Sequence, residues 1–380
     1  FSEGLLKSIE DKGYREPSPI QRESIPAILS GKDILATAQT GTGKTAAFVL
    51  PILQKLIEQE RPEGKRPIKA LILTPTRELA LQVGQSVNAY AAHVPIKQAT
   101  IFGGVNAKPQ IKALSRSVDI LVATPGRLFD LSEQKALSLS EVEFLVLDEA
   151  DRMLDMGFIQ DIVRILKMIP EKRQSLLFSA TFSPEIKELT KDVLTSPVEV
   201  KVASDNAVAE NLDQHLYFLK KSNKSQLLMY LMSSGNWEQV LIFTRTKYGA
   251  DHLYEKLQDN HIPAVVIHGK KTQVVRNKAL AQFKKKAVKV LVATDVAARG
   301  LDIKELPHVV NFDVPNVPED YVHRVGRTGR AGLSGHAVTL TCDEEVLFIN
   351  RIERLTQSKM KVCYDKKFSI KIDINEDGDY

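Results

Sequence analysis

Residues 148–151 read Asp-Glu-Ala-Asp and directly follow the apolar run of residues 144–147. A short apolar run that ends in acidic residues predicts a buried parallel strand that carries carboxylates to its C-terminal end. Ligands bind at that edge of open α/β sheets. Asp148 is therefore a candidate ligand for Mg²⁺, and Glu149 is a candidate for polarising a water molecule. The alternative is a solvated acidic turn after a strand, and the four residues alone do not separate the two.

A second pattern with a chemical use occupies residues 38–45, which read Ala-Gln-Thr-Gly-Thr-Gly-Lys-Thr. Glycines there allow the backbone to wrap around phosphate oxygens, and the start of the following helix adds N–H donors. Lys44 would reach the β- and γ-phosphates, and Thr45 would place its hydroxyl on Mg²⁺. A Gly/Thr turn before a helix is the alternative, and Ala38 stands where the usual pattern has glycine. The predicted phosphate-binding residues are Thr40, Gly41, Thr42, Gly43, Lys44 and Thr45.

A phosphate loop together with an acidic strand end predicts a nucleotide hydrolase. Asp148 is then the acid on the metal side, acting through water because Mg²⁺ keeps several water ligands. Glu149 is the best candidate to orient or deprotonate the attacking water. We therefore predict Thr45 and Asp148 as the Mg²⁺ residues, and Lys44, Asp148 and Glu149 as catalytic residues.

These residues need a framework of strands to position them. Short apolar runs alternate with helical segments in both halves of the chain, which predicts βαβ units and mostly parallel sheets flanked by helices. The runs occupy residues 34–36, 70–73, 120–123, 144–147 and 176–178, then 240–243, 264–267, 288–293, 309–312 and 337–340. We predict an α/β protein with a first domain over residues 1–204, a linker over 205–212, a second domain over 213–360 and a C-terminal tail over 361–380.

The composition bounds the class of protein. The chain has 380 residues, 43% hydrophobic and 26% charged, which is typical of a globular protein with room for two full cores. The net charge of +5 permits a basic face without requiring one. Two cysteines cannot form a disulfide framework, so we expect a reducing compartment and a cytoplasmic protein. No apolar stretch of about 18 residues predicts a membrane span. The chain begins at Phe1 rather than Met, and we expect residues ahead of it.

Further motifs follow in a recognisable order. They are Gly-Tyr at 13–14 with Pro-Ser-Pro-Ile-Gln at 17–21, Pro-Thr-Arg-Glu-Leu-Ala at 75–80, Gly-Gly at 103–104, Thr-Pro-Gly-Arg at 124–127, Ser-Ala-Thr at 179–181, Phe-Thr-Arg-Thr at 243–246, Gln and Arg at 273 and 276, the segment 293–302, and His-Arg-Val-Gly-Arg-Thr-Gly-Arg at 323–330. With the two patterns above, the sequence closely resembles the DEAD-box RNA helicases over residues 5–355. Within that family of two tandem RecA-like domains it looks most like the bacterial RhlE type.

The resemblance extends the nucleotide site and implies ATP as the nucleotide. It implies that Gln21 reads the adenine edge, a role that suits a side chain able to donate and accept at once. It also places Tyr14, Gly300 and Asp302 with the ATP-binding residues. Arg327 and Arg330 match the family's arginine fingers, whose fixed donors suit a charged transition state. On spacing alone, a Pro-rich turn at 17–21 and a basic turn at 323–330 are the alternatives.

The resemblance also implies an RNA partner held by its backbone. Helix N-termini, glycine N–H groups, Thr hydroxyls and Arg side chains bind phosphates without reading bases. The residues implied to contact RNA are Pro75, Arg77, Gly103, Gly104, Thr124, Arg127, Thr244, Arg276 and Thr294. Those implied to couple the sites are Asp151, Ser179, Thr181, Asp295, His323 and Arg324. Any of these motifs alone would also be explained by a cap or turn.

The resemblance implies an RNA-dependent ATPase that locally unwinds short RNA duplexes or remodels RNA–protein complexes by closing its two domains. Two alternatives remain at this point. One is a DNA-directed translocase of the same superfamily. The other is an ATP-gated RNA clamp with little unwinding activity, which the core motifs do not separate from an unwinding enzyme.

Overall fold

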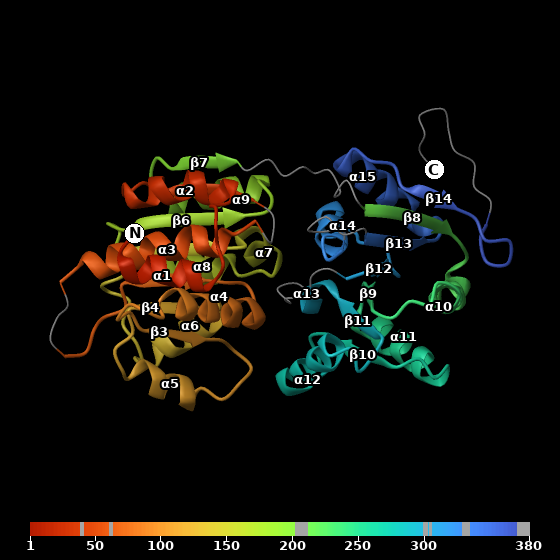
Figure 1. The fold of residues 1–380 in the computed structure, drawn as a ribbon, viewed down its shortest axis with the longest axis horizontal. Coiled ribbons are helices and arrows are strands. Elements are labelled where there is room, and N and C mark those ends of the chain that lie inside the picture. The colour runs from red at the N-terminus through yellow and green to blue at the C-terminus, as the bar shows by residue number, and fades with distance from the viewer. Residues whose placement is uncertain are drawn as a thin grey trace. The chain divides into compact units, whose positions relative to one another are not determined.

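The computed structural model describes residues 1–38, 42–60, 64–201, 212–298, 303, 306–328 and 335–370. The chain divides into two compact units, Phe1–Ser204 and Asp205–Tyr380, each built around its own seven-stranded parallel sheet (Figure 1). The predicted α/β class with parallel sheets flanked by helices is therefore confirmed. Most of the predicted linker, residues 205–211, lies outside the described residues.

The sheet of the first unit has the order β3-β4-β2-β5-β6-β1-β7. Because its strands are parallel, the residues that follow each strand gather at one edge. The order places β2, β3 and β4 in one half of that edge and β1, β5 and β6 in the other. The strands are β1 (Ile34–Thr37), β2 (Ala70–Leu73), β3 (Gln98–Ile101), β4 (Ile120–Ala123), β5 (Phe144–Asp148), β6 (Gln174–Ser179) and β7 (Val198–Lys201).

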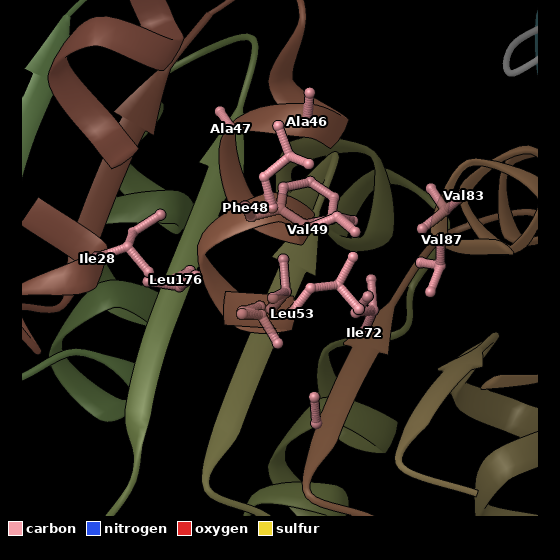
Figure 2. Packing of buried hydrophobic residues seen from close by; sticks show 14 of the residues in the cluster. Ile28, Ala46, Ala47, Phe48, Val49, Leu53, Ile72, Val83, Val87 and Leu176 are labelled. Carbon is pink, nitrogen blue, oxygen red and sulfur yellow. The ribbon is translucent and has the colours of Figure 1, made fainter. Parts of the chain in front are cut away.

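Helices cover both faces of this sheet, which explains why the sequences of its inner strands are largely continuous apolar runs. On one face, Phe48 and Leu53 of α3 pack among Ile72 and Leu176 of the strands (Figure 2). The other face packs against α5 to α9. The helices are α1 (Glu3–Asp11), α2 (Pro19–Leu29), α3 (Lys44–Glu58), α4 (Arg77–Tyr90), α5 (Lys108–Leu114), α6 (Pro125–Glu133), α7 (Ala150–Asp155), α8 (Ile159–Leu166) and α9 (Pro184–Val193).

The second unit repeats the plan with the strand order β10-β11-β9-β12-β13-β8-β14. Its strands are β8 (Leu212–Phe218), β9 (Val240–Thr244), β10 (Ala264–Ile267), β11 (Val290–Thr294), β12 (His308–Asn311), β13 (Gly335–Thr341) and β14 (Lys361–Cys363). Its helices are α10 (Lys224–Ser234), α11 (Lys247–Asp259), α12 (Gln273–Lys284), α13 (Asp295–Ala298), α14 (Pro318–Val325) and α15 (Val346–Thr356), with short 3₁₀ turns η1 (Lys221–Asn223) and η2 (Asp343–Glu345).

The structure corrects the start of the predicted C-terminal tail. Strand β14 pairs in parallel with β8, and Phe368 is buried against the core of the second unit. The backbone N–H of Ile370 donates to the carbonyl of Phe218 at 2.8 Å. A three-residue strand that begins with a lysine leaves too short an apolar run to be recognised from sequence. Residues 371–380 lie outside the described part of the chain.

Among the described residues, every helix is too short or too polar to cross a bilayer.

Candidate functional site

Asp148 ends the central strand β5 and is almost fully buried, with 3% of its surface exposed. Burial raises the pKa of its carboxyl to about 6, although the nearby Lys44 ammonium opposes the rise and Glu149 adds to it. The Oδ1 atom has no hydrogen-bond partner among the described residues. A buried, unpaired carboxylate oxygen is costly unless a cation joins it. The residues present therefore fit a divalent cation at Asp148.

Lys44, near the end of the predicted phosphate loop, is the first residue of helix α3. Its side chain is buried, and Nζ donates to the carbonyl of Ala38 at 3.0 Å. The ammonium is thus held beside the end of β1, and its charge acts on Asp148 at the end of β5. Thr45 is the next residue of the helix and is half-buried. Thr40 and Gly41, also predicted to bind phosphate, lie outside the described residues.

Gln21 is joined to this loop by both ends of its amide. Its Nε2 donates to the carbonyl of Gly43 at 3.1 Å, and its Oε1 accepts from the N–H of Ser18 at 3.0 Å. The Ser18 hydroxyl donates to the carbonyl of Thr42 at 2.7 Å. Gly43 has φ +94°, and a Cβ there would lie 2.5 Å from Gln21 Nε2. The structure therefore brings Gln21 to the phosphate loop and gives it a capping-box role in α2 as well.

Tyr14 contacts α4, not the phosphate loop. Its hydroxyl is 3.1 Å from the hydroxyl of Tyr90, at the C-terminal end of α4, and its ring is partly exposed. Gln21, by contrast, contacts the start of α3. The ATP-binding role of Tyr14 stays a prediction.

Glu149 is the N-cap of helix α7 and has a left-handed backbone conformation, with φ +55°. Such a conformation is uncommon for a residue with a side chain and is found at sites where the surrounding structure holds it. Its Oε2 accepts from Nη1 of Arg152 at 2.9 Å, and both side chains are largely buried. Sequence reasoning missed Arg152. Its spacing of three residues from Glu149, on the same helical turn, was the available signal.

Asp151 ties the end of β5 to the end of β6. Its Oδ2 accepts from the N–H of Ala180 at 3.1 Å, the N–H of Thr181 at 3.1 Å and the Thr181 hydroxyl at 3.3 Å. Ser179 ends β6, and its buried hydroxyl has no hydrogen-bond partner among the described residues. The acidic motif and the Ser-Ala-Thr motif are therefore one connected unit.

The other half of the same edge brings together the residues predicted to contact RNA in this unit. Arg77 opens α4, and its guanidinium lies so close to Gly104 that a Cβ there would clash with it. Arg127, near the start of α6, donates from Nη2 to the carbonyl of Val105 at 2.9 Å. The loop after β3 is thus flanked by two arginines. Pro75 and Thr124 precede the same two helices, and Gly103 precedes Gly104.

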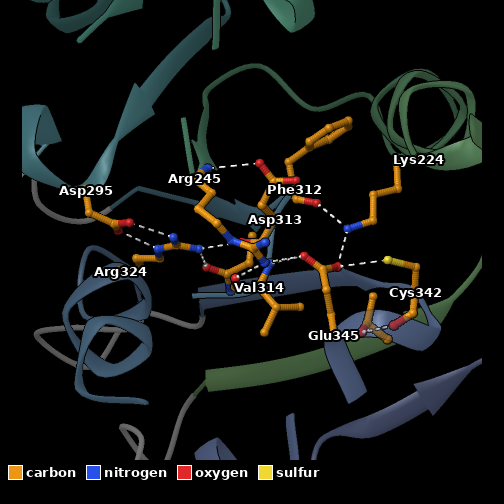
Figure 3. A network of polar contacts seen from close by, with 11 residues as sticks. Lys224, Arg245, Asp295, Phe312, Asp313, Val314, Arg324, Cys342 and Glu345 are labelled. Carbon is orange, nitrogen blue, oxygen red and sulfur yellow. Dashed lines mark hydrogen bonds and ion pairs between the residues drawn. The ribbon is translucent and has the colours of Figure 1, made fainter. Parts of the chain in front are cut away.

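In the second unit, Arg324 forms a buried pair with Asp295, two residues predicted to couple the sites. The guanidinium is 1% exposed and donates to both carboxylate oxygens of Asp295, at 2.6 and 2.7 Å (Figure 3). It also donates to the carbonyl of Asp313 at 2.7 Å and lies 5.1 Å from the ring centre of Phe243. Arg324 therefore holds α13, α14 and the loop after β12 in one arrangement.

Glu345 extends this network, and sequence reasoning missed it. Its carboxylate accepts from Lys224 Nζ at 2.5 Å, from Arg245 Nη2 at 2.6 Å and from the N–H of Val314 at 3.3 Å (Figure 3). Lys224 and Glu345 are both buried. They lie 121 residues apart in the sequence, so no local pattern could have paired them.

Glu345→Ala is expected to lower the free energy of unfolding of the second unit by about 3 kcal/mol, because the buried Lys224 ammonium loses its carboxylate partner and keeps only the carbonyl of Phe312. Chemical denaturation followed by circular dichroism measures the change. Glu344→Ala, at the exposed neighbouring position, is the matched control and should change stability little. Equal stability of the two variants would show that the ion pair contributes nothing net.

The predicted RNA residues of the second unit also meet at one sheet edge. Thr244 and Thr294 end the adjacent strands β9 and β11 and are register partners. Arg276 on α12 donates from Nη2 to the carbonyl of Ala297, in the helix that follows β11.

The structure describes only some of the residues predicted as site residues in the segments 293–302 and 323–330. Arg327 is half-buried, and its carbonyl accepts from the N–H of Leu306 at 3.1 Å. His323 lies half-buried in α14, beside Arg324. Gly300, Asp302 and Arg330 lie outside the described residues.

Comparison with known proteins gives matches in both units. The family profile of DEAD/DEAH box helicases matches residues 18–189, and that of the helicase conserved C-terminal domain matches residues 223–332. The DEAD-box ATP-dependent RNA helicase CshA of Bacillus cereus is 44% identical over 360 residues, which cover 95% of this chain and 68% of that relative. CshA of Streptococcus pneumoniae is 45% identical over 361 residues, with the same coverage. Among solved structures, S. cerevisiae Dbp5 bound to RNA and ADP BeF3 is similar with a TM-score of 0.85 and 30% identity, covering 96% of this chain and 94% of that one.

Proposed function

Because the chain belongs to the DEAD-box family of ATP-dependent RNA helicases, we propose that it is an RNA-dependent ATPase that locally unwinds short RNA duplexes or remodels RNA–protein complexes. The observation that carries the proposal is the division of one sheet edge in the first unit. One half, after β1, β5 and β6, carries the nucleotide residues, and the other half, after β2, β3 and β4, carries basic and glycine residues suited to a phosphate backbone.

In the nucleotide half, the residues of this chain have distinct roles. Lys44 and the start of α3 bind the β- and γ-phosphates, and Gln21 contacts the adenine. Thr45 and Asp148 would hold Mg²⁺, which neutralises developing charge on the phosphates when it is bound. Glu149 orients the attacking water and accepts its proton, while Arg152 holds the Glu149 carboxylate.

We propose that the two units are domains that bind ATP and RNA jointly. ATP and RNA each bind both domains, and together they favour a closed state, so each ligand raises the affinity for the other. Closure brings Arg327 and Arg330 to the γ-phosphate. In the first domain, Asp151 connects the acidic motif to the Ser-Ala-Thr segment, because its carboxylate accepts hydrogen bonds from Thr181.

The RNA is held by its backbone, so binding should depend on salt and tolerate changes of sequence. The nucleotide is ATP with Mg²⁺, and the setting is the cytoplasm. The relatives above are named CshA, and the narrower RhlE-type assignment stays a prediction.

A strand-displacement assay tests the proposed activity. A short RNA duplex with one labelled strand should separate faster with ATP and Mg²⁺ than without ATP. A chain that hydrolyses ATP and binds RNA yet separates no duplex would be the clamp that the sequence left open.

Gly104→Ala is expected to weaken RNA binding several-fold and to reduce the slope of log affinity against log salt by about 1, the change for one lost phosphate contact. Its Cβ would meet the Arg77 guanidinium, and its φ of +74° disfavours alanine. Gly157→Ala is the matched control, because its φ of +79° is similar, a Cβ there meets nothing within 4 Å, and it is not among the predicted RNA residues. Fluorescence anisotropy at several salt concentrations measures both. Identical slopes of log affinity against log salt for the two variants would show that Arg77 does not contact RNA.

A further inference from the structure

Tyr248 is an exposed aromatic residue at the functional edge of the second unit. It is the second residue of α11, and 69% of its surface is exposed. The Lys270 ammonium lies 4.5 Å from the ring centre and donates to the Tyr248 hydroxyl at 3.0 Å. One side of the ring therefore carries a cation, while most of its surface stays open.

The loop that carries Lys270 is anchored to the same helix as Tyr248. Nε2 of the buried His268 lies 3.0 Å from Oδ1 of Asp251, and Lys271 Nζ lies 2.9 Å from the same oxygen. Because Asp251 is three residues after Tyr248 in α11, the lysine and the tyrosine rest on one rigid element. A preorganised aromatic surface loses little entropy when a flat ligand stacks on it.

The position of this surface adjoins the residues assigned to RNA. A Cβ on Gly249, the neighbour of Tyr248, would lie 3.9 Å from Cβ of Thr244. Thr244 is in turn the register partner of Thr294. Lys270 places a positive charge against the ring. An open aromatic face beside a cation, next to a backbone-binding edge, matches the surfaces on which single-stranded bases stack.

We propose that Tyr248, with Lys270, is a stacking platform for one nucleobase of single-stranded RNA next to the backbone-bound tract. The proposal rests on the RNA-binding function proposed above and adds a base contact to it. Stacking is tolerant of sequence because every base has a π-face, so the contact would lengthen the RNA footprint without imposing a sequence preference.

The test uses the full chain, a non-hydrolysable ATP analogue and labelled oligoadenylates of increasing length. Tyr248→Ala should bind the longer oligomers about fivefold or more weakly, the loss expected for one stacked base, while Tyr248→Trp keeps the affinity. Tyr364→Ala removes another exposed tyrosine of the same unit and should leave affinity unchanged. In a scan of oligomers with one abasic site, one position should weaken wild-type binding and leave Tyr248→Ala binding unaffected.

The outcomes separate the proposal from the function on which it rests. If the wild type binds RNA and Tyr248→Ala binds every oligomer equally well, the stacking proposal is wrong and the RNA-binding function stands. Such a result would favour a protein partner as the ligand of the exposed Tyr248 ring. If Tyr248→Ala loses affinity by the same factor for every abasic oligomer, the ring contacts backbone rather than a base, and the proposal is again wrong. If the wild type binds no RNA with nucleotide present, both proposals fail together.

Discussion

Glu149→Gln is expected to reduce ATP hydrolysis by about 10²–10⁴-fold while ATP and RNA still bind, because glutamine cannot accept a proton from the attacking water. The substitution is nearly isosteric. Its side-chain carbonyl can still accept from Arg152, which donates to Glu149 Oε2 at 2.9 Å, so the start of α7 should keep its conformation. The loss should therefore fall on kcat, with little change in KM for ATP.

Steady-state hydrolysis with saturating RNA measures the effect, and anisotropy with a fluorescent ATP analogue measures binding. Glu143→Gln is the matched control. Glu143 lies just before β5, at the opposite end of the strand from Glu149, where it pairs with Lys69 at 2.8 Å. Hydrolysis by Glu149→Gln at near the wild-type rate would show that another group orients the water.

Arg327→Ala is expected to lower RNA-stimulated hydrolysis by about 10³-fold or more, the range measured for removal of an arginine finger. The arginine is proposed to stabilise charge on the γ-phosphate only when the two domains close. Its backbone contact with Leu306 does not depend on the side chain, so the substitution leaves that contact in place. The guanidinium of Arg324, three residues earlier, donates to Asp295 and to the carbonyl of Asp313 and so has a structural role in the second unit.

Arg327→Lys keeps the charge but loses the planar fork, and it should recover only part of the rate. Arg351→Ala, at an exposed position of α15, controls for loss of an arginine as such. ATP binding by Arg327→Ala should fall much less than hydrolysis. Equal losses in binding and hydrolysis would indicate a structural role for Arg327 instead of a catalytic one.

The strands around the nucleotide residues were predictable because they are buried on both faces and leave continuous apolar runs. Strand β5 is the clearest case, since its five residues are all buried and it ends at Asp148. Strand β14 was not predictable, because three residues with two exposed side chains give no such run. Tertiary pairing with β8 creates it.

The site likewise contains residues that the sequence predicts and residues that only the folded structure reveals. Lys44 and Asp148 were found because each lies in a short motif whose spacing is fixed by a strand and a loop. Lys224 and Glu345 were missed because their pairing depends on the folded unit and on nothing near them in sequence. The hydrogen bond from Gln21 to the carbonyl of Gly43 likewise needed the structure, since 22 residues separate the partners.

We propose that RNA controls ATP hydrolysis at Asp148 and Glu149. The most direct test compares ATP hydrolysis without nucleic acid, with single-stranded RNA, and with DNA of the same sequence. We expect strong stimulation of hydrolysis by RNA and little by DNA. Strong stimulation by DNA alone, or equal rates in all three conditions, would contradict it.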